Sequence, residues 1–306
     1  MARKRSMMKK QIPVNRSLVY GGMTPAPGGA QYTLDIFKDL SALNRKLFPQ
    51  GRCAYIESIE VLSDAGAEIT YEFKTAGNTW ITQNSFVKSK AMWDEMQQLV
   101  LADNPSVSGT WHDYKIYLDA EHEANPSQVI TGLQYGEWNY STFVLPEHTV
   151  DPATGQPLPA TEVNGLLLGN DTSTGRGLVK AYAQSRATVQ PTSPAVNASL
   201  STSFFSLLTD SGSQEPELAD VIEDENDEPP YPQANYVGGV TNLGAPVTQS
   251  MAATSVSNPH VFARGFEAEC GLVRVLVSGP AASTPIVVVH LRAGTYKGIK
   301  APAMGQ

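Results

Sequence analysis

Two apolar runs near the C-terminus constrain the fold more than any other part of this chain. GFEAECGLVRVLVSG (265–279) and TPIVVVHLRAGTYKG (284–298) are rich in β-branched residues, and the short stretch PAAS separates them. Valine and isoleucine pack well on a pleated surface, so they favour extended backbone. The two runs therefore predict an antiparallel pair of strands in the centre of a sheet.

Earlier in the chain, apolar and polar residues alternate with the period of a β-strand. CAYIESIEVL (53–62) and AEITYEFK (67–74) have this pattern, and SDAG between them predicts a hairpin turn. Further strand-like segments occur at 111–119, 127–133, 136–146 and 163–169. Residues 17–36 contain many turn residues and are interpreted as an extended leader that crosses a surface.

Helical patterns are fewer. A methionine and tryptophan stripe recurs at helical spacing within residues 87–105, and Asn84 or Ser85 can serve as its N-cap. A short helix is expected over 40–48. Residues 177–189 fit either a helix or a long strand. We interpret the stripe at 87–105 as a packing face, because such stripes more often fill a core than bind a cofactor.

Composition supports a β-rich chain with long loops. Charged residues make up 17% of the 306 residues, against about 25% in ordinary domains, whereas glycine (25) and proline (21) are frequent. Strands at unequal spacing favour an all-β sandwich or jelly roll over a repeat array. The length also permits two ordinary domains. We expect one domain over 17–306, with surface loops at 145–162 and 210–260 and one or two short helices.

Charge is distributed unevenly along the chain. The formal net charge is −8, but residues 1–16 hold six basic residues and no acidic one, so the remainder carries −14. A basic arm on an acidic body points to contact with a polyanion through the arm alone. The basic residues of the arm are Arg3, Lys4, Arg5, Lys9, Lys10 and Arg16. A nuclear-localisation signal or a solubilising tail is the alternative interpretation.

Several protein classes are not indicated by the sequence. Cys53 and Cys270 are its only cysteines and belong to no C-x-x-C or Cys/His cluster, so neither a disulfide scaffold nor a zinc site is expected. No run of 18 apolar residues occurs, and no apolar signal segment follows the basic N-terminus. We therefore expect no membrane span and no ordinary secretion signal.

The segment LLLGNDTSTGRGLVKAYAQSR (166–186) has the order of a phosphate-binding loop, with an apolar stretch, a glycine-rich loop and a helical pattern. Its glycines, Gly169 and Gly175, are six residues apart, Arg176 occupies the lysine position, and Gly177 replaces the hydroxyl residue. We therefore interpret it as a connecting loop. Nucleophile-elbow, zinc-protease and dinucleotide-binding motifs are also absent from the sequence, so the chain is not expected to be an enzyme.

Two acidic regions are candidates for cation binding. The first contains imidazole and carboxylate groups that can hold a transition metal or form a hydrolase site: His112, Asp113, Asp119, Glu121, His122 and Glu123. The second, residues 215–228, holds eight carboxylates that could bind calcium. Neither has a spacing that determines a coordination geometry, so polar strand ends and a solvated loop are the alternatives. We expect no cofactor and leave a structural divalent cation open.

The order of segments along the whole chain points to a family. A short basic arm is followed by strands, by the segment GRGLVKAYAQSRATVQP (175–191), and by the closing runs AECGLVRVLVSG and TPIVVVHLRA. This order, with YAQSRATV (182–189) as its local anchor, resembles the capsid proteins of small circular, Rep-encoding single-stranded DNA viruses. The resemblance implies a single jelly roll of eight main antiparallel strands. It also implies self-assembly of about 60 copies, or a multiple, into an icosahedral shell.

The resemblance further implies a role for the arm. Its basic residues, Arg3, Lys4, Arg5, Lys9, Lys10 and Arg16, would face the phosphates of a single-stranded DNA genome, and the protein would be found in the virion and, during assembly, in the host nucleus. Many members have a longer arm. In a shell of about 60 copies, six charges per copy give roughly 360 positive charges, whereas encoding 306 residues requires about 918 phosphates. We expect polyamines, metal ions, basic residues of the body or a net negative charge to account for the difference.

Two other functions remain as alternatives. A β-sandwich binding module, such as a phage tail or fibre protein or a carbohydrate-binding protein, would have the same strands and loops but would not need the arm. A hydrolase would use the cluster at 112–123. Deletion of residues 1–16 separates a coat protein from a binding module, because only the coat protein would lose nuclease-protected DNA.

Overall fold

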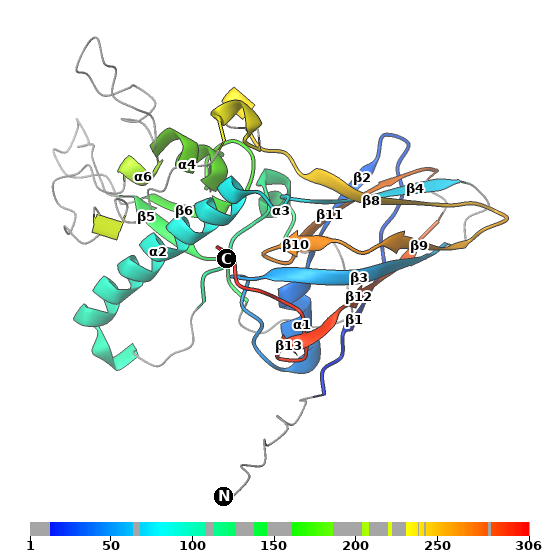
Figure 1. Ribbon diagram of the computed structural model, residues 1–306, viewed down its shortest axis with the longest axis horizontal. Helices are drawn as coiled ribbons and strands as arrows, with labels where there is room; N and C mark the ends of the chain where they lie inside the picture. Colours follow the sequence, from blue (N-terminus) through cyan, green and yellow to red (C-terminus); the bar gives the residue numbers. More distant parts are fainter. Residues whose placement is uncertain are drawn as a thin grey trace, which may run out of the picture.

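In the computed structural model of this chain, two β-sheets stack on each other and a group of helices lies at one end of them (Figure 1). The structure describes residues 13–63, 68–107, 113–126, 138–145, 161–185, 204–207, 220–221, 231–237, 239–241, 243–280 and 283–305. The strand predicted at 127–133 lies outside these residues, as do most of the loop at 145–162 and most of the acidic stretch at 215–228.

The first sheet consists of antiparallel strands in the order β1, β12, β3 and β10, with β9 also paired to β3. Their bounds are β1 Ser17–Tyr20, β3 Cys53–Leu62, β9 His260–Arg264, β10 Glu267–Glu269 and β12 Ile286–Leu291. A row of facing side chains crosses four of these strands, through Leu18, Val289, Ile59 and Ala263. All four are buried, so this face of the sheet belongs to the core.

The strands β9 and β10 form one bent strand. Arg264 of β9 is opposite Ser58, and Glu267 of β10 is opposite Tyr55, so the register along β3 does not change between them. The bend falls at Gly265, where a Cβ atom would lie 2.3 Å from the carbonyl oxygen of Glu57. Among the described residues, the first sheet therefore contains four strands in effect, and the two sheets together contain eight.

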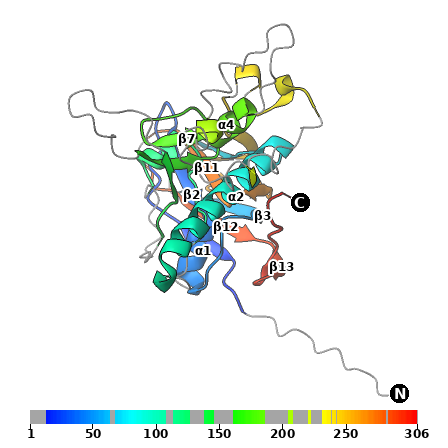
Figure 2. The same cartoon turned by 90° about the vertical axis from the view of Figure 1, so that its left-hand side faces the viewer.

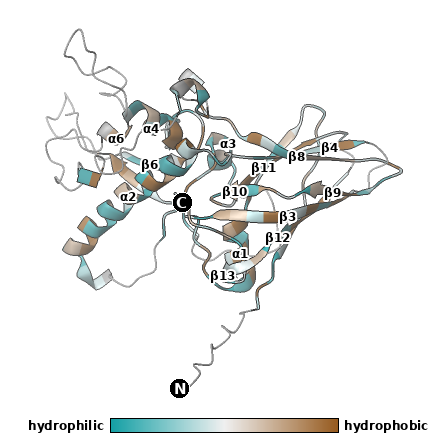
Figure 3. Ribbon diagram, in the orientation of Figure 1, coloured by the Kyte–Doolittle hydropathy of each residue, from teal (hydrophilic) through white to brown (hydrophobic). Residues whose placement is uncertain are grey.

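The second sheet is also antiparallel, in the order β2, β11, β4 and β8. Its strands are β2 Ala30–Asp35, β4 Ile69–Thr75, β8 Val247–Thr254 and β11 Leu272–Ser278. Every second residue of β4 is buried, including Ile69, Tyr71 and Phe73. This is the period-two pattern read from the sequence, and it turns the apolar face of β4 toward the first sheet. The apolar and polar bands along β3 follow the same rule (Figure 3).

Consecutive strands of the sandwich alternate between the two sheets. β1, β3 and β12 lie in the first sheet, and β2, β4 and β11 lie in the second. With β9 and β10 taken as one strand, β4 and β8 are the only consecutive pair of the described strands that shares a sheet of the sandwich. The predicted all-β fold with antiparallel strands is therefore confirmed. The strand order agrees with the predicted jelly roll, in which two Greek keys share one core.

Both predicted hairpins are wrong. The closing runs form β11 and β12, which are central in opposite sheets and do not pair with each other. β3 and β4, expected to be joined by a turn at SDAG, also belong to opposite sheets. The alternation of residues determines which side of a strand faces the core, but not which strand its backbone bonds. A short connection can cross between sheets, and here it places the apolar faces of both strands against one another.

Two segments expected to be irregular contain strands. The leader at 17–36 supplies β1 to one sheet and β2 to the other. The predicted surface loop at 210–260 contains β8, which pairs with β4 over residues 247–254. Glycine, serine and alanine made this segment look like a loop, but β8 is an edge strand with one free side, where small and polar residues are tolerated.

The chain between β4 and β8 forms an insertion with a core of its own, on the side of the molecule that faces the viewer in Figure 2. Its helices are α2 Trp80–Asp103, α3 Ala120–Ala124, α4 Leu178–Ser185 and α6 Phe204–Leu207, and its small sheet is β5 Thr142–Leu145, β6 Thr161–Leu166 and β7 Gly175–Gly177. This core also includes Cys53, Cys270 and Leu272 from the sandwich. The insertion therefore packs on the end of the sandwich.

The helices differ from the prediction in length and position. The helix expected at 87–105 is α2, which begins at Trp80 with Thr79 as its N-cap. Met92 and Trp93 are buried and Met96 packs against their cluster, whereas Val100 is 53% exposed, so only the first part of the stripe packs into a core. The helix expected at 40–48 is α1 (Ile36–Asn44), with Asp35 as its N-cap. The segment 177–189, predicted as a helix or a long strand, contains the helix α4. The segment 111–119, predicted as a strand, forms in its described residues only an isolated bridge at Tyr117.

Three short 3-10 helices and a C-terminal hairpin complete the described elements. The 3-10 helices are η1 Pro105–Val107, η2 Gln233–Asn235 and η3 Gly239–Thr241. The hairpin begins with β13 (Ala293–Tyr296), which is bridged to Ile299. Within the described part of the chain, no helix has the length and apolar character needed to cross a bilayer.

Candidate functional site

The predicted nucleic-acid-binding arm joins the sandwich at the start of β1. Arg16 is exposed, and its carbonyl oxygen accepts a hydrogen bond of 2.9 Å from the backbone N–H of Leu291. Asn15 and Asn44 of α1 exchange two hydrogen bonds, of 2.8 and 3.1 Å. The backbone of Arg16 is thus fixed to the first sheet just before β1. The other predicted residues lie outside the described residues: Arg3, Lys4, Arg5, Lys9 and Lys10.

The glycine-rich segment at 166–186 is a strand, a loop and a helix, formed by β6, β7 and α4. The carboxylate of Asp171 accepts hydrogen bonds from the backbone N–H of Gly177 (3.0 Å) and from Nζ of Lys180 (2.8 Å). Arg176 donates to the carbonyl oxygens of Thr172 and Gly175, at 2.7 and 3.0 Å. The loop thus satisfies its own donors with a carboxylate that would repel a phosphate. These contacts support the interpretation of a connecting loop.

The predicted cluster at 112–123 is divided among separate partners. Asp119 caps α3 by accepting from the backbone N–H of His122 and forms an ion pair with Arg274. Glu123 accepts from Asn164 at 2.9 Å and from Thr172 at 3.0 Å. Glu121 accepts instead from Asn125, at 3.0 Å. His112 lies outside the described residues, and within those residues no group of three or more His, Cys, Asp or Glu side chains converges on a point.

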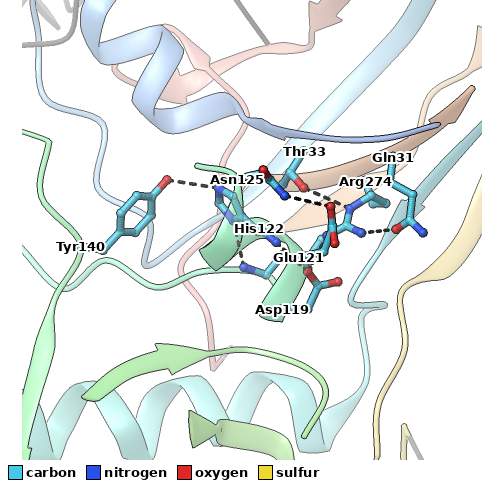
Figure 4. A network of polar contacts seen from close by, with 9 residues as sticks. Gln31, Thr33, Asp119, Glu121, His122, Asn125, Tyr140 and Arg274 are labelled. Carbon is cyan, nitrogen blue, oxygen red and sulfur yellow. Dashed lines mark hydrogen bonds and ion pairs between the residues drawn. The ribbon is translucent and has the colours of Figure 1, made fainter. Parts of the chain in front are cut away.

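His122 belongs to a buried polar chain that connects the insertion to the sandwich (Figure 4). Its Nδ1 accepts from the backbone N–H of Leu118 at 3.1 Å, and its Nε2 lies 3.2 Å from the hydroxyl of Tyr140. The Tyr140 hydroxyl in turn donates to Asp35 at 3.3 Å. Because Nδ1 is an acceptor, the ring proton resides on Nε2 and is donated to Tyr140. The chain of donors therefore runs from His122 through Tyr140 to Asp35.

Burial determines the protonation of both ends of this chain. Desolvation lowers the pKa of His122 to about 3, so the imidazole is neutral at physiological pH. Desolvation raises the pKa of Asp35 to about 7, although the backbone N–H of Lys38 favours its ionised form. Gln50 holds the same carboxylate by donating at 2.8 Å. These contacts give the network a positioning role between α1, α3 and the segment before β5.

Arg274 makes a second link between the insertion and the sandwich (Figure 4). It projects from β11, is 3% exposed, and donates to Thr33 at 3.0 Å and to Gln31, both on the neighbouring strand β2. Its third partner is Asp119, at the start of α3. One guanidinium thus joins β2, β11 and α3. Sequence analysis did not identify Arg274, although a charged residue inside the apolar run GLVRVLVSG was a readable signal that a partner must be buried with it.

Lys88 was also missed. It lies on α2, is fully buried, and donates to the hydroxyl of Ser185 on α4 at 3.1 Å. The rings of Tyr182 and Phe205 lie 5.2 and 5.4 Å from its ammonium. This group of contacts joins α2, α4 and α6, and no sequence pattern indicated it because its members are far apart along the chain.

Comparisons with protein-family models, with curated proteins and with solved structures found no match to this chain.

Proposed function

We propose that this chain is a viral coat protein whose copies assemble into an icosahedral shell around a single-stranded DNA genome. The observation that carries the proposal is the order of the eight sandwich strands, together with the entry of a basic arm at the edge strand β1. The outer face of the first sheet carries exposed side chains, whereas the insertion covers Leu272 and Arg274 on the outer face of the second sheet. The exposed face of the first sheet can contact a neighbouring copy.

The outer face of the first sheet supports a role in assembly. Val19, Leu62, Phe262 and Ile286 project from it and are 55%, 38%, 63% and 44% exposed. Large apolar side chains gathered on one sheet face are typical of a surface that contacts another protein. In a shell this face would be covered by the next copy.

A polar row crosses the same face. Ser17 lies 3.0 Å from Nδ1 of His290, whose Nε2 lies 3.3 Å from Glu60. Nε2 of His260 lies 2.7 Å from the Glu60 carboxylate. These hydrogen bonds lower the pKa of Glu60, His290 making the largest contribution. These contacts favour the ionised form of Glu60 among the exposed apolar side chains. A partner surface would therefore have to match both the charge and the apolar residues of this face.

The test is assembly of the full chain, followed by negative-stain electron microscopy and sedimentation. We expect closed, uniform particles that protect DNA from nuclease. A matched variant of the same length replaces Arg3, Lys4, Arg5, Lys9 and Lys10 with glutamine. It should still form particles, with much less protected DNA, because the phosphate contacts of the arm are lost.

A chain that stays monomeric under all assembly conditions would overturn the proposal. It would favour a β-sandwich binding module, especially if the glutamine variant behaved like the native chain. Deletions should stop at residue 12, because Asn15 and Arg16 hold the start of β1 in place and a longer deletion would damage the sandwich itself.

A further inference from the structure

Basic side chains gather on the sandwich where the arm enters it. They come from the start of β1, the end of α1, the start of β3 and the C-terminal hairpin. We call them the arm-foot patch: Arg16, Arg45, Lys46, Arg52, Arg292, Lys297 and Lys300. α1, β13 and the beginning of the described chain lie together at this side of the sandwich (Figure 1).

Backbone hydrogen bonds hold the hairpin in place against β3. The N–H of Arg292 donates to the carbonyl of Tyr55 at 2.9 Å, and the N–H of Tyr55 donates to the carbonyl of Lys300 at 3.2 Å. The backbone N–H of Lys300 donates to the carbonyl of Arg292 at 2.8 Å. The turn uses two residues with positive φ, Lys297 (46°) and Gly298 (95°). The positions of the hairpin cations are therefore determined by regular backbone contacts.

Aromatic rings hold three of the cations. The guanidinium of Arg52 lies 3.5 Å from the centre of the Tyr296 ring and donates to the carbonyl of Ala301 at 2.8 Å. The ammonium of Lys300 lies 3.7 Å from the centre of the Tyr55 ring. Lys297 lies 5.4 Å from the Tyr296 ring and donates to the carbonyl of Leu47. Such contacts orient a cation without neutralising it.

Carboxylates do not neutralise this patch. Within the described residues, none of its seven cations forms an ion pair, whereas Lys74, Lys90 and Lys180 on other surfaces pair with Glu72, Asp94 and Asp171. Two carboxylates act on residues of the patch or on their partners: Glu267 accepts a hydrogen bond from Tyr55, and the charge of Asp113 acts on Lys297. The patch therefore gathers seven positive charges on a chain whose formal net charge is −8.

We propose that the arm-foot patch binds the phosphates of single-stranded DNA and extends the binding surface of the arm onto the folded body. This inference rests on the proposed coat function for the identity of the polyanion. Hydrogen bonds between Asn15 and Asn44 hold the start of the described chain beside Arg45 of the patch, and the five further cations of the arm precede this point in the sequence. One strand of nucleic acid can therefore contact both.

The patch changes the charge ratio of the particle. It adds six cations to the six of the arm, because Arg16 belongs to both sets. In a shell of about 60 copies, twelve charges per copy give roughly 720, against about 918 phosphates for the shortest coding strand. Basic residues of the body would thus supply about half of the positive charge next to the genome.

The test measures binding of the full chain to a 20-nucleotide oligo-dT by fluorescence anisotropy at several salt concentrations. The patch variant is Arg292→Gln, Lys297→Gln and Lys300→Gln, three exposed side chains whose backbone contacts remain. Each lost phosphate contact on a single strand removes about 0.7 from the slope of log K against log salt. We expect the slope to fall by about 2, and the affinity at 0.15 M salt to fall by at least about tenfold.

The matched control removes three cations that are already paired, by Lys74→Gln, Lys90→Gln and Lys180→Gln. Its slope should change by less than about 0.5. An unchanged slope in the patch variant, or an equal fall in the control, would overturn the inference. An unchanged slope combined with weaker retention on heparin would assign the patch to an anionic polysaccharide instead. Particle formation is scored separately by electron microscopy, so failure of the coat function and failure of the patch are distinguishable.

Discussion

At the scale of single residues, buried charges mark the places where the sequence departs from the pattern of its strands. Arg274 is buried in β11 and is paired with Asp119, so its cost of burial is offset by three partners. Glu269 is fully buried at the end of β10, and desolvation raises its pKa to about 7. The first charge links two parts of the molecule, and the second makes stability depend on pH.

Replacement of Glu269 with glutamine should stabilise the protein at alkaline pH. The pKa in the folded state (about 7) exceeds the unfolded value of 4.5, so the native protein retains a proton that the unfolded chain releases. The stability that this group contributes is fully present below pH 4.5 and is lost as the pH rises through 7. In urea unfolding, Glu269→Gln should raise the free energy of unfolding above that of the native chain by about 2–3 kcal/mol at pH 8, and by almost nothing at pH 4.5.

The control for this prediction is Glu267→Gln, two residues earlier on the same strand and partly exposed. Its effect on the free energy of unfolding should be similar at the two pH values. An equal gain for Glu269→Gln at both pH values would contradict the assigned pKa.

At the scale of elements, the first sheet depends on a bend between β9 and β10. Both pair with β3 in one continuous register, and between them the backbone N–H of Ile56 donates to the carbonyl of Phe266 at 2.9 Å. Gly265 lies at this point because any side chain would collide with the carbonyls of Ile56 and Glu57. The bend lets one strand continue along β3 while the sheet twists.

Replacement of Gly265 with alanine should therefore destabilise the sandwich. The added Cβ would lie 2.3 Å from two backbone oxygens, which cannot move without breaking the pairing of β3. We expect a loss of more than about 2 kcal/mol in the free energy of unfolding, measured with urea. Gly21→Ala is the matched control, because nothing lies within 4 Å of its Cβ position, and it should change stability by less than about 1 kcal/mol. Equal effects of the two changes would contradict the assigned bend.

At the scale of the whole molecule, two hydrophobic cores meet at the end of the sandwich. The sandwich core lies between its two sheets, and the core of the insertion lies among α2, α4, α6 and the small sheet. Cys53, Cys270 and Leu272 come from the sandwich but belong to the core of the insertion. The polar chain through His122 and the guanidinium of Arg274 join the same two parts. The insertion and the sandwich should therefore unfold together.

Calorimetry of two cavity variants tests this coupling. Phe143→Ala empties part of the second core, and Val275→Ala empties part of the first, since both side chains are fully buried. Each variant should show one unfolding transition, at a lower midpoint temperature than the native chain. The free energy of unfolding should fall by about 3–5 kcal/mol for Phe143→Ala and by about 1–3 kcal/mol for Val275→Ala. Two transitions, each moved by only one variant, would contradict the coupling.

The sequence by itself determined where strands occur and which of their faces are buried. β3 was predicted with its bounds, β11 and β12 lie within the predicted runs, and β4 ends one residue beyond its predicted run, because side chains alternate across a strand whatever its neighbours are. It also determined that a charged arm precedes an acidic body. Local chemistry accounts for both properties, so neither requires the fold to be known.

Only the tertiary structure decided the pairing of the strands, the insertion between β4 and β8 and the partners of the buried charges. β11 and β12 are neighbours in the chain, yet they lie in opposite sheets. Arg274 and Asp119 meet although they are 155 residues apart. These contacts depend on which surfaces remain open once the two sheets have stacked, and that condition involves the whole chain at once. A local pattern carries no information about it, because the same alternating strand can pair along either edge.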